Sequence, residues 1–295
     1  MEKRPARIRG VLCILASAAG FALMGFFVRL ADDFGAPAGA IQKSVFRNVV
    51  AFAVAAVAFA RSRRRTPAPA ARPTLPPGTV PLLVLRSIAG TLGIFGNFYA
   101  LSHLPLGDAT MLNKLSPFFT ILFAAAFLGE RAGPARFACV AGAFAGAALV
   151  AKPGFGIDDP LAVLAGAGSG MAAGAAYACV RTLGRRGVPG SLIVLFFSGF
   201  STLAALPFAA LSFVPMSGAQ IAILSAAGLS AAAGQFGITA AYRYAPPRDI
   251  AVFDYTNVVF AAALGFAFLG QIPDPLSVAG YALIVAMAAV SARAK

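Results

Sequence analysis

Charged residues are scarce in this sequence of 295 residues. Only 12% of the residues are charged, whereas 59% are hydrophobic. A water-soluble chain of this size carries roughly 25% charged residues, so the composition excludes an ordinary soluble domain. A membrane-spanning helix needs about 20 apolar residues, and the chain is long enough for ten such spans on short loops. The composition therefore predicts an all-α integral membrane protein.

Residues that serve catalysis, metal binding or disulfide bonding are also few. The chain has three cysteines, one histidine and no tryptophan, and the cysteines lie inside apolar runs without CxxC spacing. These residues provide neither a disulfide framework nor a cluster of metal ligands, and there is no Ser/His/Asp set for nucleophilic catalysis. The sequence also lacks a GxxxxGK(S/T) motif for nucleotide phosphates. We therefore expect no cofactor, no bound metal and no enzymatic activity.

Hydrophobic runs bounded by glycine, proline or charge divide the chain into ten predicted transmembrane helices. Of the 24 lysines and arginines, 18 lie at the two termini and in the loops at one end of the predicted bundle. This bias is typical of the cytoplasmic side, so we expect cytoplasmic termini in the inner (plasma) membrane of a bacterial-type cell. It also explains the net charge of +14 without nucleic acid. The predicted spans are 11–30, 37–60, 80–101, 107–128, 134–152, 160–183, 190–214, 219–243, 247–269 and 274–292.

The second half of the sequence repeats part of the first at an offset of 141 residues. Five spans in each half is an odd number, so the two halves must lie in opposite orientations in the membrane. Inverted repeats are typical of alternating-access transporters, which bind substrate near the midplane between the halves. We predict two inverted five-helix repeats, residues 1–152 and 153–295. The matched positions include Pro105 with Pro246, Asp108 with Asp249, Phe127-Leu128-Gly129 with Phe268-Leu269-Gly270, and Pro134 with Pro275.

The motif LPLGDA at residues 104–109 is followed by an apolar helix that ends in LGER at residues 128–131. This pattern resembles the EamA domain of the drug/metabolite transporter superfamily, and Arg47 resembles an arginine common in that family. The second half departs from it, since Gln271 and Ile272 replace the Glu-Arg of LGER. The resemblance implies a monomeric secondary carrier whose cavity is lined mainly by spans 1, 3, 4, 6, 8 and 9. The chain looks like the YddG-type aromatic amino-acid exporters of this family.

Lys114 and Asp254 are the first candidates for a binding site. An ionisable group inside a span costs several kcal/mol unless it faces a cavity or a partner. Lys114 lies roughly 10 Å inside span 4, and Asp254 lies about as deep in span 9. Facing a cavity, they would offer a cation to a carboxylate and an anion to an ammonium, as a zwitterionic amino acid requires. Alternatively, they pair with each other or with backbone and lock the two halves together.

Other residues at membrane depth are further candidates for the cavity. Lys43 and Arg47 share one face of span 2, where Lys43 can snorkel at the outer end and Arg47 is expected to snorkel or to bind backbone carbonyls. His103, at the outer end of span 3, is either a gate or proton-coupling group or an interfacial cap. Interhelical hydrogen bonds or packing are the alternative for the remaining candidates, which are Asn97, Tyr99, Gln235, Tyr177 and Tyr242.

Two carboxylates that follow Pro turns are expected to be structural. Asp108 and Asp249 occupy equivalent positions in the repeat and are predicted to cap the N-termini of spans 4 and 9. Glu130 is expected to form a charge pair with Arg131 at the cytoplasmic end of span 4.

These features together predict a secondary transporter that exports small metabolites by alternating access around a central cavity. Amino acids, aromatic or otherwise neutral, are the expected substrates, and a gradient of substrate or protons is the expected driving force. Export of another metabolite or of a drug-like cation is the alternative within transport. An intramembrane enzyme is the alternative of a different class.

Overall fold

The computed structural model describes residues 3–36, 38–65, 75–104, 112–151, 159–270 and 272–293. All regular secondary structure in these segments is helical. The elements are α1 (Lys3–Ala31), η1 (Asp32–Phe34), α2 (Ala40–Arg65), α3 (Thr79–His103), α5 (Ser116–Leu128), α6 (Pro134–Ala151), α7 (Pro160–Arg185), α8 (Gly190–Leu211), α9 (Gly218–Tyr244), α10 (Pro247–Ile250), η2 (Ala251–Tyr255), α11 (Thr256–Leu269) and α12 (Pro275–Arg293).

The predicted ten-span architecture is confirmed. In the described residues, nine helices are long and apolar enough to cross a membrane when α10, η2 and α11 are counted as one, and α5 is a shorter apolar helix. The first residues of span 4, up to residue 111, lie outside the described segments. The boundary predicted between residues 152 and 153 also lies outside them and stays a prediction.

Spans 4 and 9 both change conformation at equivalent positions. A turn at Lys114 precedes α5, and the 3-10 segment η2 ends at Tyr255 just before α11. The span predicted over residues 247–269 is therefore present, but it is divided into α10, η2 and α11. The interruption coincides with Asp254, Thr256 and Asn257, polar side chains that a fully lipid-facing helix would not tolerate.

The C-terminal ends of α5 and α11 are also alike. Gly129 and Gly270 end these helices with φ angles of 66° and 63°, a left-handed conformation that favours glycine. Their N–H groups donate to the carbonyls of Ala124 and Gly265. Each pair of equivalent residues is 141 positions apart, so the repeat read from the sequence is present in the backbone.

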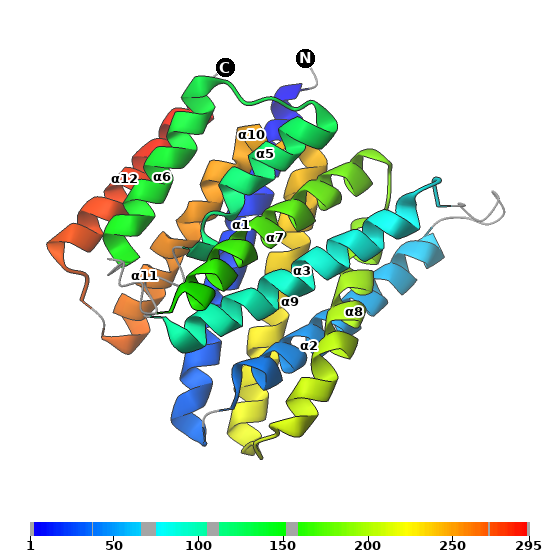
Figure 1. Ribbon diagram of the computed structural model, residues 1–295, viewed down its shortest axis with the longest axis vertical. Coiled ribbons are helices and arrows are strands. Elements are labelled where there is room, and N and C mark those ends of the chain that lie inside the picture. The colour runs from blue at the N-terminus through cyan, green and yellow to red at the C-terminus, as the bar shows by residue number, and fades with distance from the viewer. Residues whose placement is uncertain are drawn as a thin grey trace.

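The helices pack in a pattern that is preserved when the two halves are exchanged. Helix α1 packs on α9 as α3 packs on α7, and α5 packs on α7 as α11 packs on α1. Helix α2 also packs on α9, as α8 packs on α3. Two further contacts join helices to their own counterparts: α6 lies beside α12 at one edge of the bundle, and α2 beside α8 at the other (Figure 1). This symmetry is that of two inverted five-helix repeats around a central axis.

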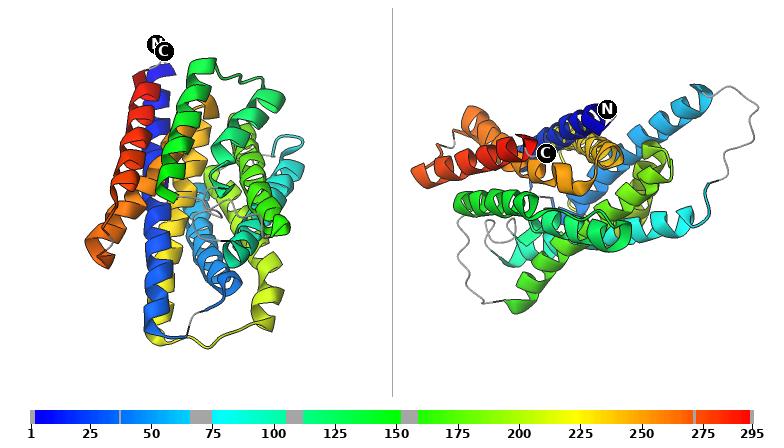
Figure 2. Two further views of the ribbon diagram at one scale, coloured as in Figure 1. Left: turned by 60° about the vertical axis from the view of Figure 1, so that its left-hand side comes forward. Right: turned by 90° about the horizontal axis from the view of Figure 1, so that it is seen from above.

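The outer surface and the two ends of the bundle fit a membrane-spanning chain. Large apolar side chains such as Leu122, Phe127 and Leu203 are well exposed, which suits contact with lipid. The first and last helices bring the chain ends to the same end of the molecule (Figure 2), where the Arg7 guanidinium donates to the Ser291 carbonyl. An even number of crossings is the simplest topology that leaves both ends together.

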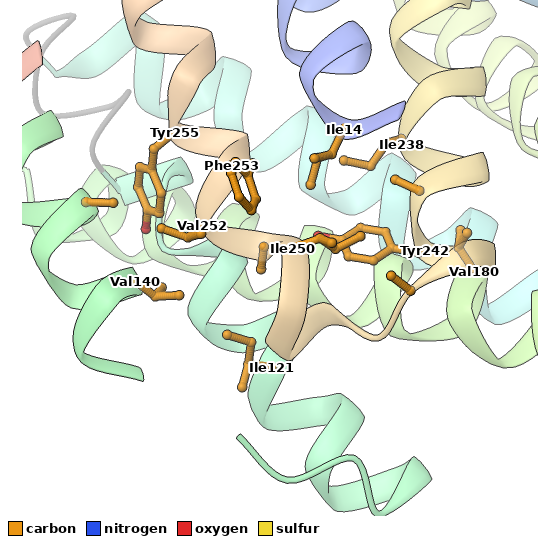
Figure 3. Packing of buried hydrophobic residues seen from close by; sticks show 14 of the residues in the cluster. Ile14, Ile121, Val140, Val180, Ile238, Tyr242, Ile250, Val252, Phe253 and Tyr255 are labelled. Carbon is orange, nitrogen blue, oxygen red and sulfur yellow. The ribbon is translucent and has the colours of Figure 1, made fainter. Parts of the chain in front are cut away.

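The apolar core gathers around the interrupted part of span 9. In Figure 3 the α10–η2 stretch lies between side chains of the surrounding helices. Most residues of this stretch are buried, which suits the rule that non-helical backbone at membrane depth is tolerated where protein covers it. The labelled contributors are Ile250, Val252, Phe253 and Tyr255 from this stretch, with Ile14, Ile121, Val140, Val180, Ile238 and Tyr242 around it.

Candidate functional site

A cavity of about 290 Å³ lies between the two halves. Its volume is at the lower end of the range for small-molecule sites, which is roughly 300–1,000 Å³. Residues from α1, α2, α3, α7, α8, α9 and α11 line it, together with the segments where spans 4 and 9 are interrupted. The lining residues are Phe21, Met24, Arg47, Arg86, Gly90, Gly93, Ile94, Asn97, Asn113, Lys114, Ser116, Ala173, Ala176, Tyr177, Phe197, Gln235, Asp254 and Asn257.

Lys114 and Asp254 meet in this cavity. The Lys114 ammonium lies 3.6 Å from the Asp254 carboxylate, and each side chain is 13% exposed. The hydroxyl of Tyr255 donates to the carbonyl of Lys114 at 2.8 Å. Because Tyr255 is the repeat counterpart of Lys114, this hydrogen bond crosses between equivalent points of the two halves. The sequence left two alternatives for these residues, a position in the cavity or an ion pair that joins the halves. In the structure, Lys114 and Asp254 line the cavity and also pair with each other.

Four amides surround the cavity, and two of them are already hydrogen-bonded. Asn113 donates to the Ser169 hydroxyl at 3.0 Å, and Asn257 donates to the Ala18 carbonyl at 2.9 Å. Asn97 and Gln235, two sequence candidates, also line the cavity, and the buried Nε2 of Gln235 has no partner within the described residues. A buried hydrogen-bond donor without an acceptor costs free energy. The side-chain amide of Gln235 is therefore available to bind a polar group of a solute.

Tyr177 and Tyr242 have different positions relative to the cavity. Their rings are 5.4 Å apart, but Tyr177 lines the cavity whereas Tyr242 is 1% exposed and belongs to the core behind it. The structure thus places Tyr242 as a support for Tyr177. Phe21, Met24, Ile94 and Phe197 supply the other large apolar side chains of the lining.

Tyr99, His103 and Lys43 lie away from the cavity. Tyr99 follows Asn97 by two residues, about 200° around a helix, so it faces outward when Asn97 faces the cavity. Its ring is 37% exposed and stacks on His103, which lies four residues later, with the ring centroids 4.1 Å apart. Lys43 pairs with Asp32 at 2.6 Å.

Two arginines make the cavity more basic than the sequence predicted. Arg47 lines it, and so does Arg86 on α3, which is 2% exposed. The sequence favoured a structural role for Arg47 and assigned none to Arg86. The available signal was the position of each arginine inside an apolar span, where an ionisable residue is a candidate site by default.

The expected structural carboxylates have other partners. Asp249 does not cap α10, whose N-cap is Pro246 without a side-chain hydrogen bond; it lies in the first turn and pairs with Arg136 at 2.9 Å. A carboxylate there suits the helix N-terminus and reaches a basic side chain of the neighbouring helix. Asp108 lies outside the described residues.

Glu130 also has a different partner from the one expected. It pairs with Arg181 at 2.8 Å rather than with its neighbour Arg131. Adjacent residues point apart, and the folded chain brings α7 next to the end of α5.

Comparison with known proteins places this architecture in a transporter family. The model of the EamA-like transporter family matches residues 8–152. The pseudopaline exporter CntI of Pseudomonas aeruginosa is 35% identical over 217 residues, which are 73% of this chain and 76% of the exporter. A riboflavin transporter of Rhizobium johnstonii is 32% identical over 203 residues, which are 68% of this chain and 66% of that transporter.

More distant relatives extend the likeness over the whole chain. Solute carrier family 35 member G1 of Homo sapiens is 25% identical over 310 residues, covering 97% of this chain and 79% of the carrier. A solved crystal structure shares the fold with a TM-score of 0.79 at 21% identity, over 96% of both chains. These relatives do not confirm the resemblance to YddG-type exporters. The ten-span fold, the family match and the 35% identity together show that the chain belongs to the EamA-like transporter family, within the drug/metabolite transporter superfamily.

Proposed function

We propose that the protein exports a small amino-acid-like metabolite by alternating access, with Lys114 receiving a carboxylate of the solute and Asp254 its ammonium. The observation that carries this proposal is the position of the Lys114–Asp254 pair, inside the cavity and between the two halves. A zwitterion would insert between the two charges and replace one ion pair by two. Binding would then loosen a contact that holds the halves together, as a rocking mechanism requires.

The charge of the lining supports an acidic or zwitterionic solute. Three basic side chains and one carboxylate line the cavity in the described residues. A drug-like cation would meet net repulsion there, so this alternative loses its support. Neutral amides around the same space suit a polar metabolite with several hydrogen-bonding groups.

The relatives support the direction and the coarse substrate class. One is an exporter of pseudopaline and another transports riboflavin, so small metabolites are the cargo of both. We infer outward transport from the exporter, and placement in the inner membrane with cytoplasmic termini from the basic loops. We further propose that the protein acts as a monomer, without nucleic acid and without an enzymatic reaction.

Transport by the purified protein in proteoliposomes tests the proposal. Labelled aromatic, aliphatic and acidic amino acids would be offered to wild type, Lys114→Gln and Asp254→Asn. The control is Lys43→Gln, which removes a lysine of comparable exposure whose partner, Asp32, lies outside the cavity lining. We expect saturable transport that falls at least about tenfold in both cavity variants, as for a lost charge-assisted hydrogen bond, and changes little in the control.

Two results would contradict the proposal. One is transport by Lys114→Gln at the wild-type rate and half-saturating concentration, which would remove the proposed carboxylate contact. The other is transport of no amino acid by well-folded wild-type protein in sealed vesicles. Far-UV circular dichroism melts would show that each variant is folded.

A further inference from the structure

Arg86 is buried in the wall of the cavity without a counter-charge. Its side chain is 2% exposed, and its Nε and Nη1 have no hydrogen-bond partner among the described residues. The guanidinium carbon lies 3.6 Å from the centroid of the Phe197 ring. Stacking on an aromatic face stabilises the cation but leaves its N–H edge unused.

The local sequence makes room for this position. Gly90 follows Arg86 by one helical turn, and a Cβ added there would lie 2.5 Å from Nη1 and 2.7 Å from the Phe197 ring. Any other residue would displace the guanidinium or the ring. The glycine therefore leaves space for the guanidinium of Arg86 stacked on Phe197.

A second arginine adds positive charge to the same cavity. Arg47, from α2, lines the same cavity as Arg86. Among the described lining residues Asp254 carries the one carboxylate, and it is paired with Lys114. No ion pair within the described segments includes Arg47 or Arg86. Burying two cations together without an anion costs free energy. A bound anion would reduce that cost.

We propose that Arg47 and Arg86 form an anion subsite for a second carboxylate, so that the exported solute is an amino-acid-like compound with at least two carboxylates. This inference rests on the proposed function, in which Lys114 and Asp254 receive the first carboxylate and the ammonium. A solute with two carboxylates and one ammonium would meet all four charges of the lining. Arginine suits the role because its planar fork binds a carboxylate through two parallel hydrogen bonds.

Glutamate and glutamine provide a matched pair of probes, since they differ by one carboxylate. In proteoliposomes we expect wild type to half-saturate at a concentration at least about tenfold lower with glutamate than with glutamine, the factor expected of one charge-assisted contact. In Arg86→Gln we expect the ratio of the two half-saturating concentrations to fall below about two. The reason is that glutamate should bind more weakly, while the binding of glutamine should stay the same. Gly90→Ala should reduce the preference in the same way by displacing the guanidinium.

The stability of the ligand-free protein separates a binding role from a structural one. Replacing an uncompensated buried charge should raise the melting temperature of Arg86→Gln above that of wild type, because binding residues are often held at a cost in stability. A lower melting temperature together with unchanged preference for glutamate would assign Arg86 a structural role and overturn the proposal. Lys43→Gln serves again as the control and should change neither quantity.

The remaining outcomes also decide the question. Equal half-saturation by glutamate and glutamine in wild type, with transport by Lys114→Gln still reduced at least about tenfold, would overturn the second subsite but leave the proposed function standing. Failure to carry either solute would overturn both. Competition by inorganic phosphate as strong as that by glutamate would show that the arginines bind phosphate, and would overturn the carboxylate assignment.

Discussion

Glu130 joins three segments of the chain at the end of the bundle that carries the basic loops. Its carboxylate accepts hydrogen bonds from Nε and Nη2 of Arg181 at 3.0 and 2.8 Å. Nη1 of the same guanidinium donates to the carbonyls of Tyr242 and Arg243 at the end of α9. One side-chain pair therefore connects the end of α5 to α7 and α9. Arg185 approaches the same carboxylate at 3.6 Å but is 51% exposed.

The different burial of these two arginines leads to a prediction. Arg181→Gln should destabilise the protein by about 2–4 kcal/mol, since it leaves a mostly buried carboxylate and two carbonyls without their partner. Arg185→Gln removes the same charge from the same helix but should cost at most about 1 kcal/mol, as for exposed pairs. Far-UV circular dichroism melts in detergent would compare them. Similar losses in the two variants would show that net charge, and not the buried pair, sets the stability here.

At the scale of the element, the two interrupted spans hold the residues that we propose bind the solute. Spans 4 and 9 each change conformation at the residue that meets its counterpart, Lys114 and Tyr255. The interruption exposes a lysine and a carboxylate to the cavity, while the regular helices α5 and α11 complete the crossing. Repeated irregular elements at membrane depth suit a binding site at the interface of inverted repeats.

The long helices approach each other closely at some glycines but not at others. Alanine substitutions at two of these glycines should therefore have different effects on the stability of the protein. In α6, a Cβ on Gly146 would lie 2.8 Å from the carbonyl oxygen of Gly280 on α12. Gly146→Ala should therefore destabilise by about 1–3 kcal/mol through overpacking against backbone. In α7, a Cβ on Gly168 meets nothing within 4 Å, so Gly168→Ala should be neutral or stabilising by up to about 1 kcal/mol through helix propensity.

Melting of the two alanine variants in detergent would show the difference. The comparison is matched because both glycines lie inside long helices and both changes add one methyl group. A Gly146→Ala variant as stable as wild type would mean that α6 and α12 can separate slightly at no cost. Their crossing would then be a mobile contact and not a fixed one.

At the scale of the whole molecule, the sequence was sufficient for the architecture but not for side-chain orientation. The ten spans follow from the local hydropathy of the sequence. The offset of 141 residues follows from motifs that recur along the chain. The direction of a side chain depends on helix rotation and on neighbours far away in sequence. For this reason the sequence could not show that Asn97 and Gln235 line the cavity whereas Tyr99 and His103 lie away from it. The stacking of Arg86 on Phe197 depends on the packing of α3 against α8, which no local sequence pattern encodes.

The orientation of the molecule in the membrane gives the last prediction. In a background with Cys13, Cys139 and Cys179 replaced by alanine, single cysteines would be introduced as Ala135→Cys and Ser212→Cys. Both positions are exposed, the first at the end with the basic loops and the second at the opposite end, after α8. If the basic loops face the cytoplasm, a membrane-impermeant thiol reagent applied to intact cells should label Ser212→Cys and leave Ala135→Cys unlabelled until the membrane is permeabilised. The reverse pattern would place the basic loops outside the cytoplasm and contradict the proposed topology.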